Sequence, residues 1–112
     1  MINSSEYNIN SLSIVHEKIC AYFQVDYLYP FKKTTEKGVV YVRQIFHYIS
    51  KNICNKNIST YKYIANYLGD IIKPLNHATV INSCKKIENY LTYDKQVQKD
   101  VDSILKMINK TN

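Results

Sequence analysis

Hydrophobic positions recur at three- and four-residue intervals through most of this chain, which is typical of helices that bury one face. Stretches with this pattern begin near Ser13, after Gly38, at Ser59, at Asn76 and at Asp94. No segment alternates polar and apolar residues in the way that a half-buried strand does. The sequence therefore predicts an all-α fold, a bundle of five to six helices.

Residue types that begin or end helices lie beside several of the apolar stripes. Ser59 and Asp94 are residue types that cap helix N-termini, and Gly69 is placed to end the helix that begins at Ser59. The positions that we expect to face the core are Val15, Ile19, Tyr22, Phe23, Val42, Ile45, Phe46, Ile49, Ile53, Tyr61, Ile64, Ala65, Leu68, Val80, Cys84, Ile87, Leu91, Val97, Val101, Ile104 and Ile108.

The connection between the first two long helices has two parts. We expect Asp26 to cap a short turn that carries Tyr27 and Leu28 into the core, and Pro30 to end that turn. The following residues, FKKTTEKG, are polar and basic, which predicts an exposed loop. In the helix after that loop, a second face carries Arg43, His47 and Lys51 at four-residue spacing.

The length of 112 residues suits one domain with one modest core. We expect a flexible segment over residues 1–12 and a single helical domain over residues 13–112. The composition, 46% hydrophobic and 21% charged, is ordinary for a soluble globular protein. No apolar run approaches the roughly 18 residues that a membrane helix needs. The polar start predicts no secretory signal, and three widely spaced cysteines favour a reducing cytoplasm.

Several kinds of chemistry are unlikely on composition. With Gly38 and Gly69 as its two glycines, the chain has no glycine-rich phosphate loop, so we expect no nucleotide cofactor. The three histidines and three cysteines lack the paired spacing of a metal site. His16 and Glu17 are neighbours in sequence, and a half-buried histidine beside a surface glutamate explains them. The nine acids form no evident pair, so we expect neither a catalytic residue nor an enzyme.

The charge is unevenly distributed. The chain carries a net charge of +6, and residues 31–60 alone hold six cations against one acid, a net of +5. A cationic excess confined to one region favours an anionic partner there, although a solvated basic face would give the same count.

Two of the predicted helices, at 59–68 and 76–91, are joined by a short turn and form a candidate helix-turn-helix. A helix that enters the major groove presents its first turn to the bases, here Asn76, His77, Ala78 and Thr79. Asparagine suits adenine, histidine donates or accepts, and the alanine and threonine methyls suit a thymine methyl. In the alternative interpretation Asn76 is only the cap and the others are ordinary first-turn residues.

The order of segments resembles a known family, the carboxy-terminal DNA-binding domain of the bacterial chromosomal replication initiator DnaA. The similarity runs from about Ser13 to Ile108, and we expect the chain to be a stand-alone, divergent copy of that domain. The segments in which the resemblance lies are IVHEKICAYFQVDYL, the basic loop FKKTTEKG, VRQIFHYISK, NHATVINSCKKIENYL and YDKQVQKDVDSIL. The most specific motifs are H-x-T-V and the K-I pair downstream of it.

The resemblance implies roles for individual residues. His77 and Thr79 match base-contacting positions, Asn76 stands where the family has an acid, and Ala78 replaces a serine or threonine. The residues that we expect at the DNA backbone or in the minor groove are Lys32, Lys33, Lys37, Arg43, Lys51 and Lys73.

The chain also departs from the family's pattern. The basic loop has Thr34 and Thr35 among its lysines, where the family is rich in arginine, and lysine lacks the planar fork that suits the minor groove. Leu75 replaces an arginine just before the signature, and the turn after Gly69 is longer than usual. We therefore do not expect the initiator's own sites to be recognised as a matter of course.

We accordingly predict sequence-specific binding of double-stranded DNA, with the helix that starts near Asn76 in the major groove and the loop at residues 32–37 at the adjacent groove and backbone. Neither a membrane nor a nucleotide is an expected partner. We expect a role in replication initiation, or that of a phage or mobile-element factor. The alternative is a protein-interaction adaptor on the same scaffold, which the eleven tyrosines favour.

Overall fold

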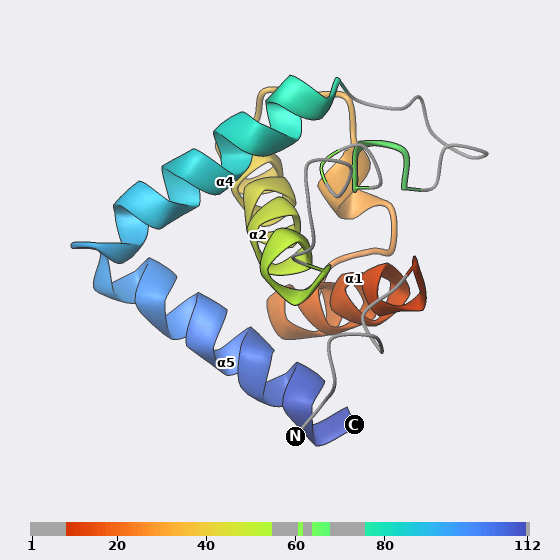
Figure 1. The fold of residues 1–112 in the computed structure, drawn as a ribbon, viewed down its shortest axis with the longest axis vertical. Coiled ribbons are helices and arrows are strands. Elements are labelled where there is room, and N and C mark those ends of the chain that lie inside the picture. The colour runs from red at the N-terminus through yellow and green to blue at the C-terminus, as the bar shows by residue number, and fades with distance from the viewer. Residues whose placement is uncertain (1–8, 55–60, 62–63, 68–75, 112) are drawn as a thin grey trace.

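The structure, a computed structural model, describes residues 9–54, 61, 64–67 and 76–111. Within those ranges the chain forms four α-helices, one short 3-10 helix and no strand, which confirms the all-α prediction (Figure 1). The elements are α1 (Ile9–Phe23), η2 (Tyr29–Phe31), α2 (Lys37–Cys54), α4 (His77–Leu91) and α5 (Lys95–Thr111).

The predicted count of five to six helices is not matched. The expected turn after Asp26 forms the 3-10 helix η2 instead of an α-helix. Half of the helix expected over residues 59–68 lies outside the described residues, together with its cap Ser59, its end at Gly69 and Pro74 in the turn that follows.

The helix α2 lies at the centre of the molecule (Figure 1). It packs against α1 on one side and against α4 on another, and α5 returns from the end of α4 to pack against both α1 and α4. This arrangement fixes the direction of α4, since α4 is packed against both α2 and α5.

The apolar stripes predicted from the sequence form the core. Nearly all of the predicted positions that the structure describes are buried, while Tyr22, Phe23, Tyr61 and Leu91 are half-buried and pack against the others. Each fully buried aliphatic or aromatic side chain contributes about 1.5–3 kcal/mol relative to an exposed one. The repeat of buried positions at three- and four-residue spacing is what selects helices over strands in this sequence.

The helix α1 begins at Ile9, four residues before the predicted start at Ser13, and Leu12 belongs to the buried stripe. It ends in a left-handed residue, Gln24, with a φ of 56°. The Val25 amide donates to the Cys20 carbonyl at 3.0 Å, which is the hydrogen bond of a Schellman motif. This termination turns the chain sharply toward η2.

The prediction that Tyr27 and Leu28 enter the core is wrong. Their exposed fractions are 52% and 41%, and the residue that the turn buries is Pro30. The side chain of Asp26 is not a cap here, because the hydrogen bond at this turn runs from the Tyr29 amide to the Asp26 backbone carbonyl, at 2.9 Å. A proline in the first positions of a short helix favours this geometry, so Pro30 lies within the turn rather than at its end.

His16 is fully buried rather than half-buried as expected. Its Nδ1 lies 3.0 Å from the hydroxyl of Tyr67, and its Nε2 lies 2.5 Å from the backbone carbonyl of Tyr27. Burial is the main cause that lowers the pKa of His16, against the opposing effect of the Tyr27 carbonyl. These bonds hold the exposed turn against α1 although its side chains face solvent.

A buried carboxylate joins three helices. The hydroxyls of Tyr22 on α1 and Tyr41 on α2 donate to the two oxygens of Asp100 on α5 at 2.7 and 2.6 Å. The side-chain amide of Gln96 donates to the same carboxylate at 2.8 Å. Burial and the nearby carboxylate hold the pKa of the Tyr41 hydroxyl well above its usual value. Each Asp100 oxygen therefore has a partner inside the protein.

Candidate nucleic-acid interface

The N-terminal tip of α4 is exposed and capped. The amide of Ala78 donates to Asn76 Oδ1 at 2.8 Å, and the amide of Thr79 donates to the Asn76 backbone carbonyl at 2.9 Å. All four residues of the tip, Asn76 to Thr79, are exposed. The capping half of the alternative interpretation is therefore correct for Asn76, while the exposure needed for DNA contact is also present.

The two faces of α4 have opposite character. Val80, Ser83, Cys84 and Ile87 are buried, whereas Asn82, Lys85 and Lys86 are exposed on the other side of the helix. Burial raises the pKa of the Cys84 thiol to about 12, as expected for an inert thiol in a core. The interior face fixes the helix and leaves a polar face for a partner.

A buried histidine orients α4 on α2. His47 Nδ1 lies 2.9 Å from Ser83 Oγ, and the Cys84 thiol donates to the His47 carbonyl at 3.5 Å. The exposed fraction of His47 is 1%, so the predicted face of Arg43, His47 and Lys51 is not one solvent face. Helical spacing places residues on one side of a helix, but it does not show whether that side is covered by α4.

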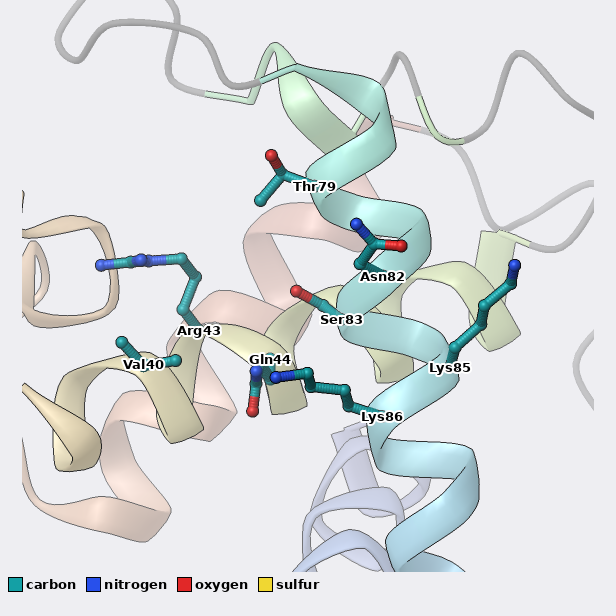
Figure 2. A pocket seen from close by; sticks show the side chains of 8 residues that line it. All are labelled: Val40, Arg43, Gln44, Thr79, Asn82, Ser83, Lys85 and Lys86. Atoms are coloured by element: carbon teal, nitrogen blue, oxygen red, sulfur yellow. The ribbon is translucent and has the colours of Figure 1, made fainter. Parts of the chain in front are cut away.

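A groove of about 400 Å³ runs between α2 and α4, next to the tip (Figure 2). Three cations and no acid line it, so an anion would be attracted there. Figure 2 shows Lys86 pointing toward Gln44, across the groove, and Lys85 pointing away from α2. The lining residues are Val40, Arg43, Gln44, Thr79, Asn82, Ser83, Lys85 and Lys86.

Arg43 connects this groove to the basic loop. Its Nε donates to the Pro30 carbonyl at 2.7 Å, and its Nη2 donates to the Lys32 carbonyl at 2.5 Å. The guanidinium is half-buried, and burial lowers the pKa of Arg43 without bringing it near neutrality. The side chain thus holds the start of the basic loop beside the groove.

The predicted basic loop is exposed. Lys32, Lys33 and Lys37 are all exposed, and Lys32 Nζ lies 5.2 Å from the centre of the Tyr29 ring. The Thr34 hydroxyl accepts a hydrogen bond from the Glu36 amide at 3.1 Å, which shapes the turn before α2. The loop therefore presents its cations on the side of η2 and the first turn of α2.

The structure brings together only part of the predicted site. Thr79 and Arg43 line the same groove, and Arg43 is bonded to the backbone of Lys32. Lys51 is on the last turn of α2, two helical turns beyond Arg43, with its Nζ 5.2 Å from the centre of the Tyr61 ring. Lys73 lies outside the described residues.

Sequence reasoning left six groove residues out of the site: Val40, Gln44, Asn82, Ser83, Lys85 and Lys86. A signal for two of them was present, because Thr79, Asn82 and Lys86 recur at three- and four-residue spacing on the face opposite the buried stripe. Gln44 had no such signal, since its place in the groove depends on how α2 packs against α4.

Two features are absent from the residues that the structure describes. These residues contain no group of three His, Cys, Asp or Glu side chains that could hold a metal ion. None of the helices in these ranges is both long enough and apolar enough to cross a bilayer.

An all-helical domain with an exposed polar helix tip beside a cationic groove has the character of a DNA-binding helix-turn-helix protein. The family model described as "Bacterial dnaA protein helix-turn-helix" matches residues 12–87. The chain therefore belongs to the family of the DnaA helix-turn-helix domain, which is a DNA-binding and not a catalytic domain. No solved structure matches the chain.

Several proteins named chromosomal replication initiator protein DnaA are similar to this chain. The protein from Flavobacterium psychrophilum is 32% identical over 98 residues, which is 88% of this chain and 19% of that protein. That from Bacteroides thetaiotaomicron is 32% identical over 92 residues, covering 82% and 18%. That from Mycoplasma capricolum is 36% identical over 70 residues, covering 62% and 14%. The chain thus spans less than a fifth of the length of these curated relatives.

Proposed function

We propose that this domain binds double-stranded DNA with sequence preference by placing the first turn of α4 in the major groove. The observation that carries the proposal is the exposure of residues 76–79 at a capped helix N-terminus, beside a groove lined by three cations. An α-helix fits the major groove of B-DNA, where the base edges present distinct patterns of donors and acceptors.

The four tip residues are proposed to make different contacts with the base edges. Asn76 Oδ1 is occupied by the Ala78 amide, so this side chain offers its amide nitrogen as a donor rather than a bidentate pair. His77 and Thr79 are exposed and carry the main polar readout, and the Ala78 methyl suits a thymine methyl. Base preference should therefore depend most on His77 and Thr79.

Affinity comes from contacts to the phosphates. The groove offers Arg43 and Lys86 as cations with Gln44 and Asn82 as neutral donors, and the loop lysines extend this surface toward the adjacent groove. If about five to seven phosphates are neutralised, the logarithm of the binding constant should fall against the logarithm of salt concentration with a slope of roughly −5 to −6.

The biological role that we propose is based on the names of the similar proteins. Proteins named chromosomal replication initiator share this domain, so the sites bound are proposed to lie where replication starts or is controlled. An adaptor function has one observation in its favour, the exposure of the neighbouring Tyr27 and Leu28. A stable protein complex without duplex affinity would favour that function instead.

The test is selection of preferred duplexes from a random pool, followed by titration of variants. His77→Ala should cost about 1–3 kcal/mol on the selected duplex and little on random duplex. Lys37→Gln should weaken binding to both duplexes alike. The matched control is Asn89→Ala, an exposed change on the last turn of α4. Absence of any duplex binding, or binding that ignores salt, would refute the proposal.

A further inference from the structure

The solvent face of α5 carries a straight row of cations, which we call the lysine stripe: Lys95, Lys99, Lys106 and Lys110. At 100° per residue these four positions fall within a sector of roughly 60°, and they extend over about 22 Å of helix. All four lysines are exposed. A regular line of charge is therefore displayed on one side of a single rigid helix.

The opposite side of α5 is fixed in the core. Val97, Val101, Ile104 and Ile108 are buried, so the helix has no apolar face free to enter a lipid layer. The helix is also tied to α1 and α2 through the buried Asp100. The stripe consequently has a fixed shape and a fixed direction.

Acidic groups reduce the charge of the stripe only in part. Asp102 lies in the same line, and its Oδ2 is 3.1 Å from Lys106 Nζ. Both side chains are mostly exposed, 65% and 72%, so this ion pair is weak and screened by salt. Asp94 is engaged as the helix cap through the Gln96 and Val97 amides, beyond the end of the line. Lys95, Lys99 and Lys110 have no ion pair with any other residue that the structure describes.

The stripe is separate from the proposed interface at the tip of α4. The tip is the N-terminal end of α4, whereas α5 starts beyond the C-terminal end of α4, and a helix of 15 residues is about 22 Å long. Figure 1 shows α5 extending from that far end of α4 toward α1, away from the tip. One straight duplex held at the tip does not account for cations in this position.

We propose that the lysine stripe is a second, sequence-independent surface that binds the phosphate backbone of another duplex DNA segment. Duplex DNA carries one negative charge per about 1.7 Å of axis, so it presents a long rigid line of charge to a rigid line of cations. The stripe consists of lysines along the side of a helix and offers no helix tip to the base edges. Its contacts with DNA are therefore electrostatic and independent of base sequence. With the tip on one segment and the stripe on another, a single chain bridges two duplexes.

The experiment measures bridging with the full chain. A biotinylated duplex on beads is saturated with protein, and capture of a fluorescent second duplex is then recorded against salt. The triple variant Lys95→Gln, Lys99→Gln, Lys110→Gln should lower capture of the second duplex at least tenfold. It should change the affinity for one selected duplex by no more than twofold. Three lost phosphate contacts should also reduce the salt slope of capture by about 3.

The matched control replaces the same three lysines with arginine, which keeps the charge and should keep bridging. Equal capture by the glutamine variant and the wild type would overturn the second surface, and so would an equal loss of binding to one duplex. Vesicles of phosphatidylglycerol and phosphatidylcholine provide a further arm. Binding of the stripe to these vesicles, without bridging of duplexes, would assign it to a membrane surface and refute the proposal.

The proposal rests on the function proposed for the tip, because bridging needs one duplex held there, and two further variants tell the two failures apart. The variant Lys32→Gln, Lys33→Gln, Lys37→Gln weakens the tip interface and leaves the stripe intact. If this variant and His77→Ala bind one duplex as the wild type does, the tip proposal fails, and bridging between the tip and the stripe fails with it. If the wild type binds one duplex in the expected way but captures no second duplex, the stripe proposal alone fails.

Discussion

His47 Nδ1 lies 2.9 Å from Ser83 Oγ, and this contact between two buried side chains joins α2 to α4 directly beneath the cationic groove. The histidine is neutral in this position, because burial, with a smaller effect of Arg43, lowers the pKa of His47 to about 3. The position of the proposed recognition helix α4 on α2 therefore depends on a neutral imidazole at His47.

Acidification should destabilise the fold through His47. Its pKa in the folded state lies below the unfolded value of about 6.5, so the unfolded state binds the proton first as the pH falls. The free energy of unfolding should be level above about pH 7.5, fall between that pH and about 3, and be lower at pH 5 by about 2 kcal/mol through this residue alone. Urea unfolding at several pH values measures the effect.

The control for this pH dependence is His47→Gln, which removes the titrating group and keeps a polar side chain facing Ser83. The pH dependence of this variant should be smaller than that of the wild type by the His47 contribution. Some dependence should persist, because burial lowers the pKa of His16 in the same direction. An identical pH profile for the variant and the wild type would contradict the assignment.

Loss of the buried carboxylate should be costly. Asp100→Asn puts an amide NH2 in place of one carboxylate oxygen, so the hydroxyls of Tyr22 and Tyr41 can no longer both donate to a charged acceptor. We expect the free energy of unfolding to fall by about 2–3 kcal/mol, as measured by denaturant titration. The same change at the exposed Asp102 should alter it by less than about 0.5 kcal/mol. Equal effects at the two positions would show that the three-helix junction contributes nothing.

The end of α1 offers a stabilising substitution. Gln24 has a φ of 56°, a conformation that costs a residue with a side chain roughly 1–2 kcal/mol and glycine very little. Gln24→Gly should therefore raise the melting temperature, with a gain of about 1 kcal/mol. Ala21→Gly, at an exposed position inside the same helix, should lower it by a similar amount. A decrease for both variants would mean that the left-handed residue is not strained.

Arg43→Lys should separate charge from geometry at the proposed interface. Lysine keeps the charge but lacks the planar fork that reaches both the Pro30 and Lys32 carbonyls. We expect about a tenfold loss of duplex affinity, which is about 1.4 kcal/mol, because the basic loop is no longer held beside the groove. Hydrogen exchange at residues 32–36 should accelerate in the same variant. Unchanged exchange with reduced affinity would assign Arg43 to the phosphates alone.

Sequence periodicity was sufficient for the interior of each helix, because burial of one face repeats locally. Val42, Ile45 and Phe46, for example, are all buried as predicted. The cap at Asp94 was likewise predictable from residue type, and the Gln96 amide donates to its carboxylate at 3.0 Å. These features depend on neighbours within one or two helical turns.

The contacts that were missed join distant parts of the chain. The partner of His16 is Tyr67, 51 residues later, and Asp100 pairs with Tyr41, 59 residues earlier. A helical pattern says nothing about which polar residue meets another across a core. For the same reason the tip of α4 could be located from sequence as a polar first turn, whereas the groove beside it required the packing of α2 on α4.

The two bonds of Arg43 to backbone carbonyls have a consequence for the speed of recognition. A long cationic side chain on a surface normally samples many rotamers, and most collisions with a phosphate find it in the wrong one. Here the guanidinium is already immobilised, so little rotational freedom is left to lose at the moment of encounter. A larger share of diffusional encounters should therefore be productive, and the benefit would appear in the association rate constant.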